Sequence, residues 1–166
     1  ASDYPVFDRS KDIRERGGHY RQSYVGYYAQ DEIGMFNDKL RLTLAGRLTT
    51  ASDLDPYAAN FVEATKFTPR VGLSYSIDKN TSTYAVYDQA FIPQAGADAN
   101  GNSFQPITGD NVELGVKREW FGGNWVTGLS LYQITKNNVL TTDPDNINFS
   151  IQLGQTVTKG IEFDIR

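Results

Sequence analysis

Chemically reactive side chains are scarce in this chain of 166 residues. It contains no cysteine and one histidine, His19, so thiol catalysis, disulfide bonds and zinc sites built on Cys or paired His lack their ligands. His19 has serines and aspartates elsewhere in the chain, but nothing in their spacing indicates a catalytic triad. No glycine-rich segment has the spacing of a phosphate-binding loop. We therefore expect no catalytic residue, no resident metal and no cofactor.

Asp53/Asp55 and Glu162/Asp164 are pairs of carboxylates that stand two residues apart. On a strand, such pairs share one face, and two neighbouring carboxylates can perform acid–base chemistry. The first pair lies in an expected loop, however, and the second continues the polar face of a strand. An enzyme is therefore the least favoured class of function for this chain.

The composition excludes further classes. The formal net charge is −4, and an acidic chain is unsuited to general nucleic-acid binding. No run of 18 apolar residues is long enough for a membrane-spanning helix. Aromatic residues nevertheless make up 13% of the chain and include ten tyrosines. These large side chains must therefore lie on elements other than membrane-spanning helices.

The end of the chain shows the clearest element, a strand over 149–165. Its odd positions are apolar except for Gln155 and Lys159, and its even positions are polar or glycine, which is the period of a strand with two different faces. About 17 residues at ~3.3 Å each span roughly 55 Å. Ordinary strands have about 5–6 residues, so this one is too long for a small sandwich.

The same alternation predicts seven strands, over 24–35, 40–50, 68–77, 83–92, 110–119, 126–139 and 149–165. Tight turns rich in Asn, Asp and Gly are expected at 36–38, 78–80 and 122–124, and longer connectors at 51–67, 94–108 and 142–148. A helical turn is expected within 56–66, and a bulge near 132–134.

Three features favour a membrane barrel over a soluble fold. The polar strand faces carry charged side chains, which suits a water-filled interior, and the connectors alternate between short and long, as in outer-membrane barrels. Aromatic residues lie beside the short turns, as expected of an interfacial girdle: Phe36, Tyr84, Trp120, Phe121 and Trp125. The predicted fold class is all-β, an antiparallel up-and-down transmembrane β-barrel segment. A soluble sandwich or small barrel remains the alternative, because any half-buried sheet alternates in this way.

The number of strands indicates a part of a larger structure. Single-chain bacterial barrels have even numbers of strands from 8 upward. An open sheet of about seven strands would expose unpaired backbone to lipid at several kcal/mol per group. We therefore expect the chain to be a segment of a larger barrel.

Eight segments carry a family resemblance: YVGYYAQD (24–31), LAGR (44–47), FTPRVGLSY (67–75), YAVYDQAFIP (84–93), ELGVK (113–117), YQITKNNVL (132–140), GQ (154–155) and KGIEFD (159–164). In this order and spacing they resemble the middle of the barrel of TonB-dependent siderophore receptors, of the ferrichrome and ferrioxamine type. The resemblance implies a barrel of about 22 strands in the outer membrane of a Gram-negative bacterium. It also implies an N-terminal plug domain, which is absent from this chain, so that residues 1–166 are a portion of the barrel domain.

The resemblance further implies the function and partners of the intact protein. Such a receptor imports a ferric siderophore with energy delivered through TonB, which acts on the missing plug and N-terminus. Its other partner is outer-membrane lipid, with no nucleic acid, and iron is present only as the transported chelate. The alternative is a self-contained small outer-membrane β-barrel or β-sandwich binding module without transport.

Two groups of site residues are expected. The family binds its chelate with aromatic and polar side chains at the outer mouth, where the candidates are Tyr57, Phe61, Phe67, Phe91, Gln94, Phe104 and Gln105; each could instead pack within its loop. The side chains expected to face the lumen and the plug are Arg41, Arg47, Arg70, Glu113, Lys117 and Glu162. Their alternative role is mutual pairing across strands, where a surface ion pair contributes only ~0–1 kcal/mol.

Overall fold

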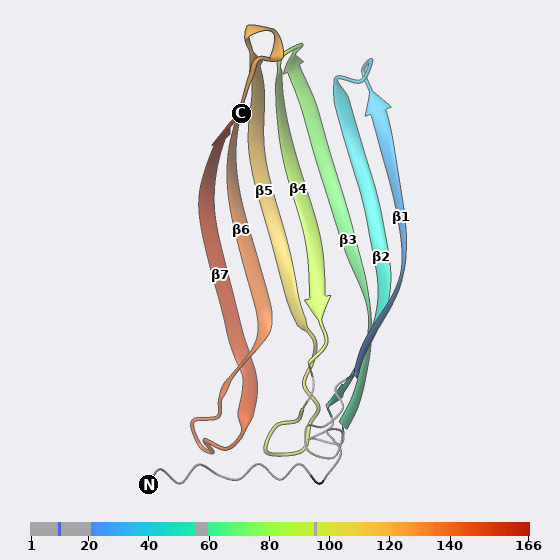
Figure 1. Ribbon diagram of the computed structural model, residues 1–166, viewed down its shortest axis with the longest axis vertical. Helices are drawn as coiled ribbons and strands as arrows, with labels where there is room; N and C mark the ends of the chain where they lie inside the picture. Colours follow the sequence, from blue (N-terminus) through green and yellow to red (C-terminus); the bar gives the residue numbers. More distant parts are fainter. Residues whose placement is uncertain (1–9, 11–20, 56–59, 95) are drawn as a thin grey trace.

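A computed structural model describes residues 10, 21–55, 60–94 and 96–166 of the chain. Seven antiparallel strands form one sheet in which each strand pairs with the next along the chain (Figure 1). The strands are β1 (Arg21–Met35), β2 (Leu40–Asp55), β3 (Asn60–Asp78), β4 (Thr81–Ile92), β5 (Ile107–Trp120), β6 (Trp125–Thr142) and β7 (Ser150–Ile165). A single 3₁₀ turn, η1 (Phe121–Gly123), precedes β6. The predicted up-and-down order of seven strands is confirmed.

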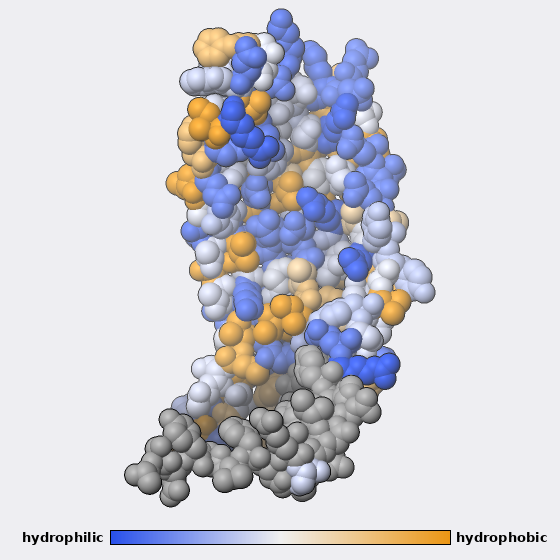
Figure 2. Space-filling model, viewed as in Figure 1, coloured by the Kyte–Doolittle hydropathy of each residue, from blue (hydrophilic) through white to orange (hydrophobic). Residues whose placement is uncertain are grey.

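The sheet is a single open layer. In the described ranges β1 and β7 do not pair with each other, and no aliphatic or aromatic side chain larger than that of Ala51 forms a buried core there. Leu73, Leu114 and Ile161 are 42%, 54% and 72% exposed, and hydrophobic side chains reach the surface along the strands (Figure 2). A soluble sandwich would cover these side chains with a second layer, so the soluble alternative is not supported.

The cross-strand register confirms the two faces expected from the alternation. One row of directly paired residues is almost wholly aliphatic: Ile33, Leu42, Leu73, Ala85, Leu114, Leu131 and Ile161. The adjacent row, on the other face, contains Glu32, Thr43, Gly72, Val86, Glu113, Tyr132 and Gly160. Directly opposite residues share a face, so the sheet has an apolar face and a mixed, charge-bearing face.

The short connectors all lie at one end of the sheet, which is the upper end in Figure 1. Phe36, Asn37 and Asp38 have φ of 55°, 57° and 61°, and Gly122 and Gly123 continue the pattern at the β5–β6 turn with φ of 70° and 92°. Asn, Asp and Gly tolerate this left-handed region. Lys79 and Asn80 form the third turn, between β3 and β4, where the Asn80 N–H donates to Asp78 Oδ1 at 2.7 Å, so the three predicted tight turns are confirmed.

The connector expected at 51–67 is largely strand, which corrects the prediction. β2 continues to Asp55 and β3 begins at Asn60, so no helix forms over 60–66, and residues 56–59 lie outside the described part. The ladder is unbroken from Thr50↔Thr65 outward, and the Thr50 and Thr65 hydroxyls hydrogen-bond at 2.8 Å. Cross-strand pairing thus outweighs the helix preference of the scattered alanines.

The bulge predicted at 132–134 lies further along β6. The β6–β7 register slips on both sides of Val139, and Asn138 has φ of 60°. Asparagine enters this region more readily than most residues, and such a bulge redirects a side chain out of the regular alternation. A second irregularity, not predicted, lies between Ser76 and Asp78 of β3.

Pairing between β3 and β4 ends beside Pro69. The last pair is Arg70↔Asp88, and the two strands separate toward the lower end of Figure 1. The Ser76 N–H donates to Lys39 next to β2 at 2.7 Å, so by alternation the odd residues of β3 direct their N–H toward β4. Pro69 has no N–H to donate there, which gives the physical reason why the ladder stops.

No helix in the described part of the chain is long and apolar enough to span a bilayer.

Candidate functional site

The six charged residues predicted to face the lumen lie on one face of the sheet. Arg41 and Arg47 of β2 pair with Ser74 and Thr68 of β3. Arg70 and its partner Asp88 lie on the same face, and the pairing of the following strands continues that face to β5 and β7. Glu113, Lys117 and Glu162 occupy this face as well. The structure therefore groups these side chains opposite the aliphatic face, while their contact with a plug stays a prediction.

An acidic cluster occupies the short-turn end of this face. The Tyr84 hydroxyl donates to Glu113 Oε1 at 2.6 Å, and Lys117 Nζ lies 5.6 Å from the Tyr84 ring centroid. A cavity of about 170 Å³ is lined by these three residues together with Ser130, Glu162 and Asp164. Three carboxylates surround one ammonium group there, so the cavity suits a cationic side chain.

Tyr84 corrects one prediction. Its position beside a short turn suggests an interfacial aromatic on the lipid side, but it shares the charged face with Glu113. The sequence around it, Ala85-Val86-Tyr87, is apolar on both faces, so the alternation there does not fix the phase. For Asp164 of the same cluster, the sequence indicates a polar strand face but does not mark a site residue.

Glycines provide space for the large side chains of this face. A Cβ added at Gly115 would collide with the Tyr84 ring, and one at Gly160 with the Tyr132 ring. Each tyrosine therefore lies over a glycine of the adjacent strand, a cross-strand arrangement in which the ring covers exposed backbone. These glycines are required by the close approach of a ring, because both have ordinary strand pairing.

Positive side chains gather on the β2–β3 part of the same face. Arg41 forms an exposed ion pair with Glu32 at 3.1 Å, and Arg47 Nε donates to Thr49 Oγ1 at 3.1 Å. Arg47 and Arg70 line a groove of about 440 Å³ where β3 and β4 separate. The charged face thus has a basic part on β2–β3 and an acidic part on β5–β7.

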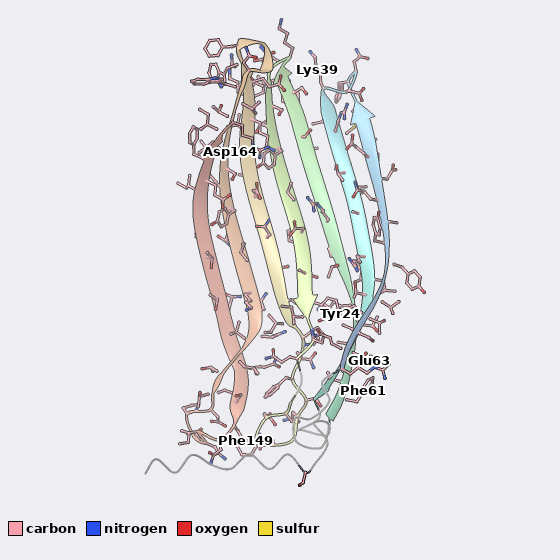
Figure 3. All side chains as sticks on the ribbon, in the orientation of Figure 1. Tyr24, Lys39, Phe61, Glu63, Phe149 and Asp164 are labelled. Carbon is pink, nitrogen blue, oxygen red and sulfur yellow. The ribbon has the colours of Figure 1, made fainter. Side chains whose placement is uncertain are left out.

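A second groove lies at the opposite end of the sheet, where the connectors are long. It has a volume of about 560 Å³ and runs between residues 61–66 of β3 and the β4–β5 loop; Figure 3 shows Phe61 and Glu63 at this end and Asp164 toward the other. The groove, which we call the outer groove, is lined by four of the residues predicted to bind ligand: Phe61, Gln94, Phe104 and Gln105. Lys66 adds a positive charge to the lining and Glu63 a negative one.

The other three predicted ligand residues are not part of this groove. Phe67 lies over Gly46 on the aliphatic side of the sheet. Phe91 pairs with Thr108 on that same side. Tyr57 lies outside the described residues. Two of the predicted loop aromatics, Phe61 and Phe67, belong to β3 rather than to a loop, because β3 extends beyond its expected start.

The tip of the β4–β5 loop is ordered by its own hydrogen bonds. Asp98 Oδ1 accepts from the backbone N–H groups of Asn100 and Asn102 at 2.9 and 2.8 Å, and Asn102 Nδ2 donates to Asp98 Oδ2 at 2.8 Å. The Asn102 side chain and then its backbone lower the pKa of the Asp98 carboxyl from its usual value. The loop is therefore held by a charged Asp98 rather than left without structure.

Polar side chains interrupt the aliphatic face toward the long-loop end. Asp110 accepts hydrogen bonds from Tyr87 at 2.9 Å, Gln89 at 2.7 Å and Asn137 at 3.2 Å, and Gln155 donates to Asn137 at 2.7 Å. We call these five residues the outer polar belt. In the sequence, the belt is marked only by polar residues at strand positions where the alternation predicts apolar ones. The hydrogen bonds that connect these residues across four strands were not predicted.

Aromatic residues bound the aliphatic face at the short-turn end. The Phe121 and Trp125 rings meet edge to face at 6.1 Å, and the Arg118 guanidinium lies 4.5 Å from the Trp120 ring. An apolar outward band bounded by aromatic residues, combined with a charged face opposite, is the arrangement of a transmembrane barrel wall. The fold therefore defines the class of the protein as an outer-membrane-type β-barrel.

Comparison with known proteins identifies the family. The profile described as "TonB dependent receptor-like, beta-barrel" matches residues 1–166. The Ferrioxamine B receptor of Salmonella typhimurium (strain SL1344) is 32% identical over 144 residues, which cover 84% of this chain and 20% of that protein. The Ferrichrome outer membrane transporter/phage receptor of Escherichia coli (strain K12) is 31% identical over 171 residues, 96% of this chain and 22% of that protein. This chain belongs to the TonB-dependent receptor family.

Solved structures agree with this assignment. The pyoverdine outer membrane receptor of Pseudomonas aeruginosa PAO1 matches with a TM-score of 0.76 and 27% identity over 88% of this chain and 22% of that one. The ferric preacinetobactin receptor of Acinetobacter baumannii matches with a TM-score of 0.75 and 26% identity, over 88% and 23%. The chain spans about a fifth of the length of its curated relatives, and it is a part of an outer-membrane barrel.

The relatives are named as receptors and transporters, in line with the transport interpretation. Among the described residues, no group of three or more His, Asp or Glu side chains is placed to hold a metal ion.

Proposed function

We propose that this chain forms part of the wall of an outer-membrane receptor that imports a ferric siderophore with energy delivered through TonB. The observation that carries the proposal is the sheet with a charged face opposite an aliphatic one, in a chain that aligns with ferrioxamine and ferrichrome receptors. The aliphatic face contacts lipid, and the charged face lines the lumen.

The outer groove is the proposed contact for the chelate. Phe61 and Phe104 supply rings that pack against the apolar shell of a siderophore, while Gln94, Gln105 and Lys66 supply donors for its oxygen atoms. The lining of the groove is more polar than apolar, which suits a ligand whose surface presents many oxygen atoms. The groove therefore recognises an oxygen-rich chelate at the outer mouth.

The acidic cluster is the proposed docking point for a basic side chain of the plug. Tyr84 already uses one oxygen of Glu113, so Glu162 and Asp164 are the carboxylates that remain available to a cation. Charge-assisted hydrogen bonds between these carboxylates and a basic side chain are stronger than hydrogen bonds between neutral groups. Breaking them would accompany the energised rearrangement that admits the chelate.

Transport is tested in the intact receptor, expressed in cells that lack other ferric hydroxamate receptors. Uptake of ⁵⁵Fe-labelled ferrioxamine B and ferrichrome should depend on the gene and on TonB. Phe104→Ala should weaken chelate binding, whereas Phe121→Ala, which alters an exposed ring at the opposite end of the sheet, should not. Binding that persists without any TonB-dependent uptake would favour the module without transport.

A further inference from the structure

Three hydrogen bonds join the end of the β4–β5 loop to β6 and β7, which are distant in sequence, and a fourth joins β6 to β7 beside them. The Gln105 backbone N–H donates to Gln152 Oε1 at 2.7 Å, and Gln152 Nε2 donates to the Gln105 carbonyl at 2.6 Å. One side-chain amide thus satisfies both backbone groups of Gln105, as a neighbouring strand would. Because Gln152 belongs to β7, the loop is tied to the barrel wall 47 positions along the chain.

The bulge in β6 supplies the other two bonds. Asn138 Nδ2 donates to the Pro106 carbonyl at 2.9 Å, and the Asn138 carbonyl accepts from Gln152 Nε2 at 3.2 Å. The slip of register at Val139 removes Asn138 from the regular ladder, which frees its side chain for the loop and its carbonyl for Gln152. Asn138 and Gln152 together form what we call the loop latch.

The loop latch holds the segment that carries two groove residues. Phe104 and Gln105 line the outer groove, and Gln105 is the residue whose backbone is bound by Gln152. The Phe104 N–H donates to the Gly96 carbonyl at 3.2 Å, so the Phe104 segment is also tied back within the loop. A connector of this length without fixed contacts would lose conformational entropy when it met a ligand.

We propose that Gln152 and Asn138 are positioning residues that fix the β4–β5 loop as a preformed wall of the outer groove. The effect on chelate binding rests on the proposed function, but the effect on the loop does not. The backbone ladder of β6 and β7 continues on both sides of the latch, and a single latch bond, from Gln152 Nε2 to the Asn138 carbonyl, joins these two strands. Loss of the latch should therefore free the loop and leave the barrel folded.

The loop itself is tested first, in the full-length receptor in detergent micelles. Gln152→Ala removes the bonds to both backbone groups of Gln105, so exchange of the Gln105 amide with deuterium should accelerate about tenfold. Gln152→Glu keeps the acceptor and loses the donor, and it should give an intermediate rate. The matched control is Gln155→Ala, a glutamine of the same strand that binds Asn137 in the outer polar belt. Equal protection in Gln152→Ala and wild type would overturn the proposal.

Positioning is then tested with ferrioxamine B as the probe. Gln152→Ala should raise its Kd about tenfold and leave the unfolding midpoint unchanged. If the latch acts through the groove, Gln152→Ala should add little in a Phe104→Ala background, and additive losses would overturn the positioning role. Faster exchange with unchanged binding would also overturn it. Failure of the wild-type receptor to bind any ferric hydroxamate would count against the proposed function instead, and the exchange experiment would still decide the latch.

Discussion

Substituting Gly115 by alanine should destabilise the barrel through the ring that lies over it. The added Cβ would collide with Tyr84, so the ring must swing away from β5. That movement breaks the 2.6 Å hydrogen bond to Glu113, which is worth about 1.5–3 kcal/mol for a charged acceptor, and the Lys117 contact at 5.6 Å, worth about 0.5–1 kcal/mol. Together these give an expected loss of about 2–4 kcal/mol.

The chain offers a matched control on the same strand. A Cβ at Gly109 of β5 would meet nothing within 4 Å, so Gly109→Ala should be neutral, or stabilising by up to about 1 kcal/mol through the unfolded chain. Unfolding of the full-length receptor in urea, in detergent micelles and followed by tryptophan fluorescence, compares the two variants. Equal midpoints for Gly115→Ala and Gly109→Ala would refute the argument, as would a full loss in Gly115→Ala when Tyr84 is already Ala.

Four further outcomes are expected. Pro69→Ala restores the missing N–H beside Gln89, so exchange of the Gln89 amide should slow, and an unchanged rate would show that Pro69 does not end the ladder. Because the pKa of Asp98 is lowered, its stabilisation of the loop tip is complete above the unfolded pKa of about 3.9 and is lost as the pH falls through the lower folded value. A spin label at position 99 should then become mobile only at strongly acidic pH, while in Asp98→Asn its mobility should not depend on pH. Arg118→Ala removes the cation from above Trp120 at 4.5 Å and the hydrogen bond to Thr81 at 2.7 Å, which should together cost about 1–2 kcal/mol and change Trp120 fluorescence; unchanged emission would contradict the contact with Trp120. Glu162→Gln together with Asp164→Asn should weaken plug retention in the intact receptor, seen as increased passage of small solutes through the barrel, and unaltered passage would remove the cluster from plug docking.

The strands, their order and their faces can be predicted because each depends on local signals. Period-two alternation places residues such as Leu114 and Glu113 on opposite faces wherever one face is clearly polar. Turn residues that tolerate positive φ, such as Asn37, mark the ends. Where these signals weaken, the prediction fails: β4 is apolar on both faces, so the predicted side of Tyr84 is wrong. The Ala-rich 51–67 segment resembles a loop in sequence, although its ladder with β2 makes it strand.

The connections between distant residues could not be predicted from one sequence. Gln105 and Gln152 are 47 positions apart, and nothing local distinguishes Gln152 from Gln155. The outer polar belt likewise needs the register of four strands before Asp110 can be matched with its donors. Four of the predicted ligand residues nevertheless line one groove, because the up-and-down topology brings the long connectors to one end; their contact with a ligand stays a prediction.

The outer polar belt also sets how far the strands extend beyond the hydrocarbon region of the membrane. Lipid tails cannot extend past a row of hydrogen-bonded amides and a carboxylate, yet β6 continues from Asn137 to Thr142, about 16 Å at ~3.3 Å per residue. The strands therefore continue beyond the bilayer as a hydrogen-bonded extension of the barrel wall. A molecule arriving from the medium meets ordered β-structure held clear of the membrane surface, so the entrance keeps its shape however the surrounding lipids move.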